Sequence, residues 1–161
     1  MTLLAPHRRS LRIPDFDYSD PNHVFFVTVK ARRGGGKGPF SDPDLCKTIV
    51  QSLHHLRDSK GVRIYCYCLM PDHLHVLLSP SERSGGLVDV VHSFKSYTTR
   101  ASWSLGRLGT LWSRSFYDRV IRDEEDFQTT CQYILGNPVR AGLVEHPDDY
   151  PYAALADFLP S

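Results

Sequence analysis

The sequence predicts an α+β fold in which a four-stranded antiparallel sheet carries two helices on one face and is followed by a third helix. Two observations lead to this prediction. Short runs rich in β-branched and aromatic residues alternate with longer runs whose apolar residues recur at helical spacing. The length of 161 residues, with 41% hydrophobic and 23% charged residues, is typical of one globular domain, so we expect residues 1–161 to form one.

The first half of the chain begins with an expected arm, a strand and a helix. Residues 1–22 are polar and contain three prolines, which favours an N-terminal arm. The run HVFFVTVKA (23–31) predicts a strand because β-branched and aromatic residues dominate it. A basic, glycine-rich loop at 32–39 leads to a helix over 42–61, which has apolar residues at helical spacing and ends at Gly61.

Two strands and a second helix come next. Residues 62–70 and 73–79 predict strands joined by Pro71-Asp72, both of which are favoured turn residues. We interpret Asp72 as turn chemistry rather than as a ligand. A helix is expected over 87–105, with an apolar side formed by Val90, Val91, Phe94 and Tyr97.

The last predicted elements are a strand over 111–121 and a helix over 123–137. Acidic residues open this helix and suit its positive N-terminal end, and Pro138 is expected to end it. The tail, 141–161, is expected to be mainly loop. The order strand–helix–strand–strand–helix–strand is that of the split βαβ, or ferredoxin-like, fold.

The charge of the chain is unevenly distributed. The net charge is only +1, but residues 141–161 contain four acidic residues and neither Lys nor Arg. Residues 1–140 therefore carry 19 Lys and Arg against 14 Asp and Glu, a net charge of +5. A basic body with an acidic tail is compatible with a polyanionic partner.

Several features of the sequence predict a cytoplasmic protein. The N-terminus has no apolar segment typical of a secretory signal, and no run of 18 apolar residues could span a membrane. The four cysteines form no CxxC pair, so we expect them to be reduced and to pack as small apolar residues beneath the helices. These residues are Cys46, Cys66, Cys68 and Cys131.

Two histidines stand two residues apart in the apolar run CLMPDHLHVLLSP (68–80). Alternate residues of a strand point to opposite faces, so His73 and His75 are expected on the face opposite to the one that meets the two helices. Two adjacent imidazoles can converge on one metal ion, although a solvent-facing pair without a ligand has the same pattern. The inner face would then carry Leu74, Val76 and Leu78.

A zinc site is an alternative interpretation of this region. Cys66 and Cys68, together with the two histidines, could supply four ligands. Structural zinc sites, however, usually have two to four residues between paired cysteines, so that a turn separates the two ligands. A single intervening residue within a strand gives no such turn, which disfavours this alternative.

One tyrosine lies off the apolar stripe of the last predicted helix. The stripe consists of Phe127, Cys131, Ile134 and Leu135. Tyr133 falls on the far side, and Asn137 shares its face because it comes four residues later. A half-buried tyrosine at the rim of the domain would explain Tyr133 alone, but not its pairing with a carboxamide.

These motifs together resemble the HUH single-strand DNA transposases. The resemblance is carried by PDHLHVLL, by QYILGNPVRAGLV about 60 residues later, and by DDYPYAA. Among that family the REP-associated tyrosine transposases are the most similar in pattern, and LWSRSFYDRVIRDEEDF resembles their fourth-strand segment. The likeness covers roughly residues 23–153, and the family fold is the same ferredoxin-like sheet.

The resemblance implies a function and a site. His73 and His75 match the pair that binds a divalent ion, Mg²⁺ or Mn²⁺, Asn137 matches a third ligand, and Tyr133 matches the nucleophile. The implied activity is metal-dependent cleavage and strand transfer of single-stranded, hairpin-associated DNA through a covalent 5′-phosphotyrosine. The chain departs from the pattern at Leu135, where the family often has His, and in its glycine-rich loop.

Basic and aromatic residues are the candidates for contacting single-stranded or hairpin DNA. The basic candidates are Arg8, Arg9, Arg12, Arg32, Arg33, Lys37, Lys95, Arg100, Arg107, Arg114, Arg119 and Arg140. Trp103 and Trp112 could stack on bases or belong to the core.

Two other functions and two assembly states stay open at this stage. A transposase-derived protein that binds DNA hairpins without cutting them would not require Tyr133, and a metallohydrolase using water would leave Tyr133 and Asn137 unexplained. A monomer is favoured over a homodimer with exchanged tyrosine helices, because the REP-associated group is expected to act as single chains.

Overall fold

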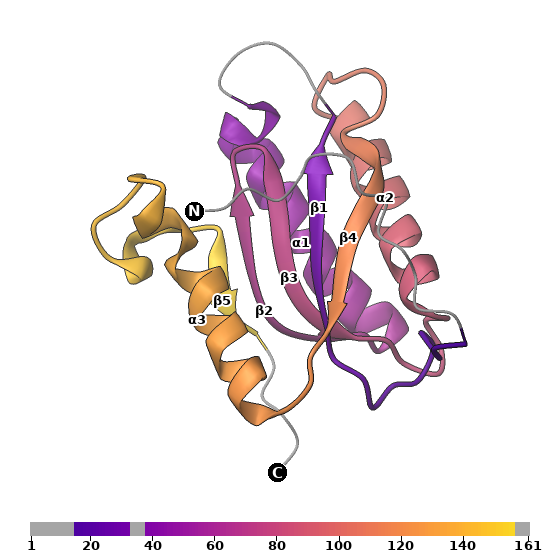
Figure 1. Cartoon of the computed structure of the whole chain (residues 1–161). Coiled ribbons are helices and arrows are strands. Elements are labelled where there is room, and N and C mark those ends of the chain that lie inside the picture. Colours follow the sequence, from indigo (N-terminus) through magenta and orange to yellow (C-terminus); the bar gives the residue numbers. More distant parts are fainter. Residues whose placement is uncertain (1–14, 33–37, 157–161) are drawn as a thin grey trace.

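The computed structural model describes residues 15–32 and 38–156. In this part of the chain five strands form one antiparallel sheet in the order β4-β1-β3-β2-β5 (Figure 1). The strands are β1 (Phe25–Ala31), β2 (Arg63–Met70), β3 (His73–Ser79), β4 (Trp112–Val120) and β5 (Ala153–Leu155). The helices are α1 (Pro43–Lys60), α2 (Leu87–Trp103) and α3 (Glu124–Arg140), with short 3₁₀ helices η1 (Pro39–Ser41) and η2 (Pro147–Asp149).

The sheet separates two hydrophobic layers. α1 and α2 cover one face and meet the inward side chains of β1, β2 and β3 there, including Leu74, Val76 and Leu78 (Figure 1). α3 lies against the other face, mainly over β2, where Cys131 and Ile134 pack on Tyr65, Cys66 and Cys68. The period-two pattern of β3 therefore sorts its side chains between the two layers as predicted.

The predicted ferredoxin-like arrangement is confirmed for the first four strands and the two covering helices. The first helix is capped by Asp42 and ends at Gly61, whose φ of 69° suits a residue without Cβ. The prediction missed β5. Its three residues pair with Cys66, Tyr67 and Cys68, and backbone bonds from Tyr152 and Ala156 extend the contact along β2.

The expectation that Pro138 ends the last helix is wrong, because α3 continues to Arg140. Proline removes one backbone donor, but the next turn keeps its own bonds: the Ala141 amide donates to the Asn137 carbonyl at 3.0 Å. Pro138 is also buried, so packing offsets the lost bond. The helix ends instead before Gly142, which has a φ of 75°.

Three smaller expectations can also be compared with the structure. Tyr97 does not join the apolar side of α2, since 41% of its surface is exposed and its ring stacks on His55. Cys66, Cys68 and Cys131 are free and buried as expected, but Cys66 and Cys68 lie beneath α3 rather than beneath α1 and α2, and Cys131 belongs to α3 itself. None of the helices in the described ranges is long and apolar enough to cross a membrane.

Candidate active site

The two histidines lie at the start of the central strand of the sheet, on the face that α3 partly covers. β3 is flanked by β1 and β2, and the turn Pro71-Asp72 leads directly into it. His75 is 7% exposed, whereas His73 at the strand end is more open. Their rings are 4.5 Å apart between centroids, so the predicted side-by-side arrangement of the two rings is present.

Each imidazole is oriented by a partner at its Nδ1 atom. Nδ1 of His73 lies 2.7 Å from a carboxylate oxygen of Asp72, and Nδ1 of His75 lies 2.9 Å from the Thr28 hydroxyl. The carboxylate accepts the proton on Nδ1 of His73, which leaves its Nε2 lone pair free. The two Nε2 atoms face each other at 3.1 Å.

This spacing fits two ligands of one metal ion. Ligands at right angles around an ion, each with a bond of about 2.1 Å, lie about 3.0 Å apart. Without an ion, the same distance suits an Nε2–H···Nε2 hydrogen bond between the two rings, which a bound ion would replace. Partners such as Asp72 and Thr28 are the usual outer contacts that fix the rings of metal-binding histidines.

His75 stays neutral over the physiological pH range. Burial lowers its pKa to about 3, and the electrostatic effects of the neighbouring His73 and Arg140 act in the same direction. A neutral imidazole has the free lone pair that a metal ion requires.

α3 brings a carboxamide and a phenol to the same place. The amide nitrogen of Asn137 lies 3.5 Å from Nε2 of His73, and a half-turn of the amide group puts its oxygen there instead. The Tyr133 ring lies 5.9 Å from the His75 ring and meets Phe26 edge-on at 6.2 Å. Tyr133 is 48% exposed, and the Arg140 guanidinium lies 4.4 Å from its ring centroid.

Polar and apolar anchors hold α3 in this position. Ile134 is fully buried against the sheet, and Sγ of Cys131 lies 3.3 Å from Sγ of Cys66 on β2. At the first turn of the helix, Asp126 accepts two hydrogen bonds from Arg119 on β4, at 2.8 and 2.9 Å. The helix therefore connects the edge strand β4 to β2, the neighbour of the strand that carries both histidines.

Comparison with known proteins identifies the family of this chain. The family profile described as "Transposase IS200 like" matches residues 22–137. The chain belongs to the IS200-like transposase family. Both halves of the site, the histidine pair and Tyr133, fall inside the matched range.

Individual relatives are REP-associated tyrosine transposases. The chain is similar to a protein so named in Haemophilus influenzae, at 30% identity over 54% of this chain and 55% of that protein, so it spans little more than half of that relative. It is 25% identical to the REP-associated tyrosine transposase of Escherichia coli K12, over 81% of this chain and 74% of that protein. These matches confirm the resemblance seen in the sequence.

A solved structure shares the fold. It is the REP-associated tyrosine transposase bound to a REP hairpin, with a TM-score of 0.71 at 20% identity, over 93% of this chain and 82% of that chain. The α+β architecture of this chain is therefore that of the matched structure.

The basic residues that were predicted to contact DNA divide into three groups. Arg8, Arg9, Arg12, Arg33 and Lys37 lie outside the described residues. Three others already contact groups of the protein. Arg119 donates to Asp126 of α3, and the Arg140 guanidinium lies over the Tyr133 ring. Arg107 forms an ion pair with Asp42 at 3.7 Å. One cavity between α2 and β4 collects the remaining four: Arg32, Lys95, Arg100 and Arg114.

The four-ligand zinc alternative is not supported. Among the described residues there is no group of three or more His, Cys, Asp or Glu side chains that could hold a metal ion. Burial raises the pKa of Cys68 to about 12, so its thiol stays protonated, and Cys66 instead meets Cys131 on α3.

Sequence reasoning missed the two groups that orient the histidines. Asp72 was interpreted as turn chemistry rather than as a ligand. It does lie in the turn, but its carboxylate also reaches Nδ1 of His73. Thr28 shares a face of β1 with Phe26, but its partner depends on the β1–β3 register, which places it opposite His75. The alternation of β1 could have predicted which face of the sheet Thr28 lies on, but not that it would contact His75.

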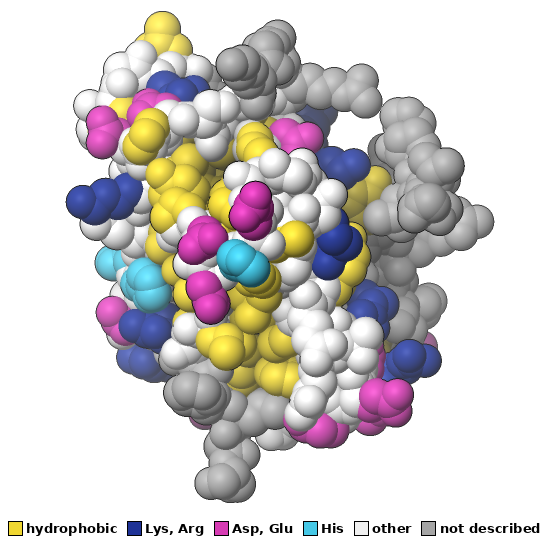
Figure 2. Space-filling view, turned by 90° about the vertical axis from the view of Figure 1, so that its left-hand side faces the viewer, with side chains coloured by type: hydrophobic (Ala, Val, Ile, Leu, Met, Phe, Trp, Pro, Cys, Tyr) yellow, Lys and Arg dark blue, Asp and Glu magenta, His cyan; other side chains and the backbone are white. Residues whose placement is uncertain are grey.

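Acidic side chains gather near the middle of the side of the molecule that carries α3 (Figure 2). Lys and Arg side chains lie toward the edges of this side. Glu145, Asp148 and Asp149 of the tail are all exposed. A polyanion would therefore approach the site from another direction.

Proposed function

We propose that this transposase cuts and rejoins single-stranded, hairpin-associated DNA with Tyr133 as the nucleophile and a divalent ion, Mg²⁺ or Mn²⁺, held by His73, His75 and Asn137. The observation that carries the proposal is the convergence of these groups in one chain. Nε2 of His73 lies 3.1 Å from Nε2 of His75 and 3.5 Å from the amide group of Asn137, and the Tyr133 ring packs beside His75.

The ligand set suits the chemistry of a phosphodiester. When bound, the ion would offset the negative charge of the phosphate oxygens and hold the phosphate in line with the attacking group. His73, His75 and Asn137 contribute no negative charge of their own, so the positive charge of the ion is not reduced. Asp72 and Thr28 hold the rings in place before DNA arrives.

Tyr133 would form the covalent bond. Its phenol oxygen attacks phosphorus, the bond from phosphorus to the 3′-oxygen breaks, the phenol proton passes to a base, and the 3′-oxygen takes up a proton. The products are a 5′-phosphotyrosine and a free 3′-OH. One P–O bond replaces another, so a 3′-OH can reverse the step without ATP. Arg140 fixes the ring and keeps a positive charge beside the nucleophile.

Two observations support hairpin DNA and action by a single chain. The structural relative was solved with a REP hairpin, and the same fold here supports a related substrate. The tyrosine lies next to His75 of its own chain, so no second copy is needed to complete the site.

End-labelled DNA tests the proposal directly. The protein is incubated with Mn²⁺ or Mg²⁺ and a hairpin carrying single-stranded flanks, and the products are separated in SDS. A 5′-phosphotyrosine keeps the 3′ part of the strand on the protein, so a 3′ label should co-migrate with it. A 5′ label should appear on a shorter, released strand that a polymerase can extend from its 3′-OH.

Three variants complete this test. Tyr133→Phe should abolish the adduct, and His73→Ala or His75→Ala should reduce it strongly. Tyr97→Phe, which alters another exposed tyrosine stacked on His55, should leave the adduct unchanged. Cleavage at the normal rate by Tyr133→Phe would favour a metallohydrolase. Hairpin binding without cleavage, across several metals and DNA sequences, would favour a protein that only binds.

A further inference from the structure

A second cavity, on the α2–β4 side of the molecule, has the composition of a nucleic-acid contact. It has a volume of about 1030 Å³ and lies between the C-terminal half of α2, the start of β4 and the residue that follows β1. Four of its lining residues are basic, several others carry hydroxyl groups, and none is acidic. The basic ones are Arg32, Lys95, Arg100 and Arg114. Such a lining attracts a polyanion.

Three of these cations are available to a ligand. Arg32, Arg100 and Arg114 are exposed, and no carboxylate in the described part of the chain forms an ion pair with them. Arg119, in contrast, is bound to Asp126. Lys95 has a different role, since its ammonium donates to the carbonyls of Ser113 and Arg114 and so holds the start of β4.

Trp103 adds an open aromatic surface to the cavity. The indole nitrogen donates to the Gly109 carbonyl at 3.0 Å, which fixes the ring, yet 52% of the residue is exposed. Trp112, the other tryptophan, is buried and donates to Thr98, so it belongs to the core. A fixed, half-exposed tryptophan among arginines is the combination on which single-stranded bases stack.

The cavity adjoins another cavity that reaches two of the candidate metal ligands. This neighbouring cavity, of about 760 Å³, is lined by His73 and Asn137. Arg32 and Ser113 line both cavities, so the two are neighbours at these residues. A strand that leaves the histidine pair on this side passes Arg32 before it reaches Trp103.

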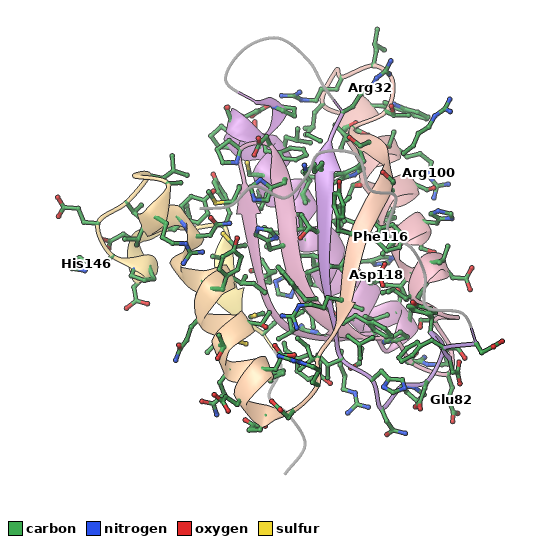
Figure 3. The ribbon with its side chains drawn as sticks, viewed as in Figure 1. Arg32, Glu82, Arg100, Phe116, Asp118 and His146 are labelled. Carbon is green, nitrogen blue, oxygen red and sulfur yellow. The ribbon has the colours of Figure 1, made fainter. Side chains whose placement is uncertain are left out.

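The distribution of charge favours the same direction. Figure 3 shows Arg32 and Arg100 on the side of the molecule formed by α2, and His146 of the acidic tail on the opposite side. A strand following this path moves away from the acidic surface beyond α3.

We propose that this cavity binds the single-stranded DNA next to the cleaved phosphate, with one base stacked on Trp103 and phosphates bound by Arg32, Arg100 and Arg114. The inference rests on the proposed function, because it identifies the strand at His73 and His75 as the one that continues into the cavity. Stacking and phosphate contacts carry little sequence information, so this cavity holds the strand for cleavage while other contacts select it.

Binding measurements in a Tyr133→Phe background test the proposal without covalent capture. Fluorescence anisotropy compares two labelled hairpins, one with a single-stranded tail and one without. Trp103→Ala should weaken binding of the tailed hairpin by about 5- to 150-fold, the range for loss of one stacked base, and leave the tailless hairpin unchanged. Trp103→Phe should restore most of the affinity, because it keeps an aromatic ring for stacking. The recovery should be incomplete, because phenylalanine cannot form the bond to Gly109 that fixes the ring.

Charge and control variants make the test specific. Arg100→Gln with Arg114→Gln should reduce the slope of log affinity against log salt by about 1.4 for the tailed hairpin, the value for two lost phosphate contacts. Tyr97→Ala removes another exposed aromatic ring of α2 and should change neither affinity. Equal binding of the tailed hairpin by all variants, or equal loss of both hairpins, would overturn the proposal.

The adduct assay separates this inference from the proposed function. If the unaltered protein forms the adduct while the Trp103 and arginine variants bind normally, the cavity proposal fails and the cleavage proposal stands. If Trp103 governs binding of the tail but no adduct forms with any metal, the cleavage proposal fails and the cavity is supported.

Discussion

Asp126→Asn should undock the first turn of the helix that carries the nucleophile. The carboxylate of Asp126 is only 8% exposed and accepts two bonds from Arg119 and one from the Arg122 amide. The variant keeps the shape of the side chain but removes its charge, and it turns an amide group toward the guanidinium. The effect should appear both in the stability of the protein and in its dependence on pH.

The magnitude follows from the pKa of this carboxyl group. Its hydrogen bond from Arg119, followed by that from the Arg122 amide, lowers the pKa from 3.8 to about 2. A depression of this size corresponds to about 2.5 kcal/mol at most, and solvent screening of the half-exposed Arg119 reduces it to about 1–2 kcal/mol. Because the folded-state pKa lies below the unfolded one, the stabilisation is complete above about pH 5 and is lost as the pH falls toward about 2.

Urea unfolding at several pH values measures this directly. At pH 7 the free energy of unfolding of Asp126→Asn should be lower than that of the unaltered protein by about 1–2 kcal/mol, and the difference should fall to about half by pH 3. Glu125→Gln, an exposed acid in the same turn, is the matched control and should change little. A difference that does not vary with pH, or one no larger than that of the control, would refute the assignment.

Three further predictions concern the metal ligands and the docking of α3. Thr28→Val should weaken Mn²⁺ binding about 10- to 100-fold by calorimetry, because it releases the ring of His75; unchanged affinity would exclude this orienting role. Ile134→Ala should lower the free energy of unfolding by about 2–5 kcal/mol in urea, since its side chain is fully buried under α3, and a loss below about 1 kcal/mol would contradict that packing. EDTA should abolish the covalent adduct and added Mn²⁺ should restore it, whereas an adduct that survives chelation would rule out a metal requirement.

Local periodicity was sufficient to predict the three helices, the first four strands and the two faces of the central strand. The alternation through His73–Ser79 separates Leu74 and Val76 from the histidines because every second residue of a strand shares a face. Asp42 and Gly61 bound α1 for equally local reasons, a side-chain cap and a left-handed turn. Such features depend on the residue and its near neighbours alone.

Features that depend on tertiary contacts could not be predicted in this way. β5 has only three residues and no alternation of its own, and it is a strand because the edge of β2 is there to pair with. Arg100 and Arg119 look alike in the sequence, yet one is exposed beside a cavity and the other is bound to Asp126. Thr28 gains its role from a strand register that no short sequence motif specifies.

β5 also has a consequence for how copies of the protein can associate. Two sheets often merge through their outer strands, and an open β2 would offer its unpaired amides and carbonyls to a neighbour. Here Ala153–Leu155, with Tyr152 and Ala156 beside them, already bond to the backbone from Tyr65 to Leu69. A neighbouring molecule would have to displace this segment before it could pair with β2, and the outer edge of β5 itself offers only three strand residues. This short strand therefore limits the fusion of two sheets at that edge.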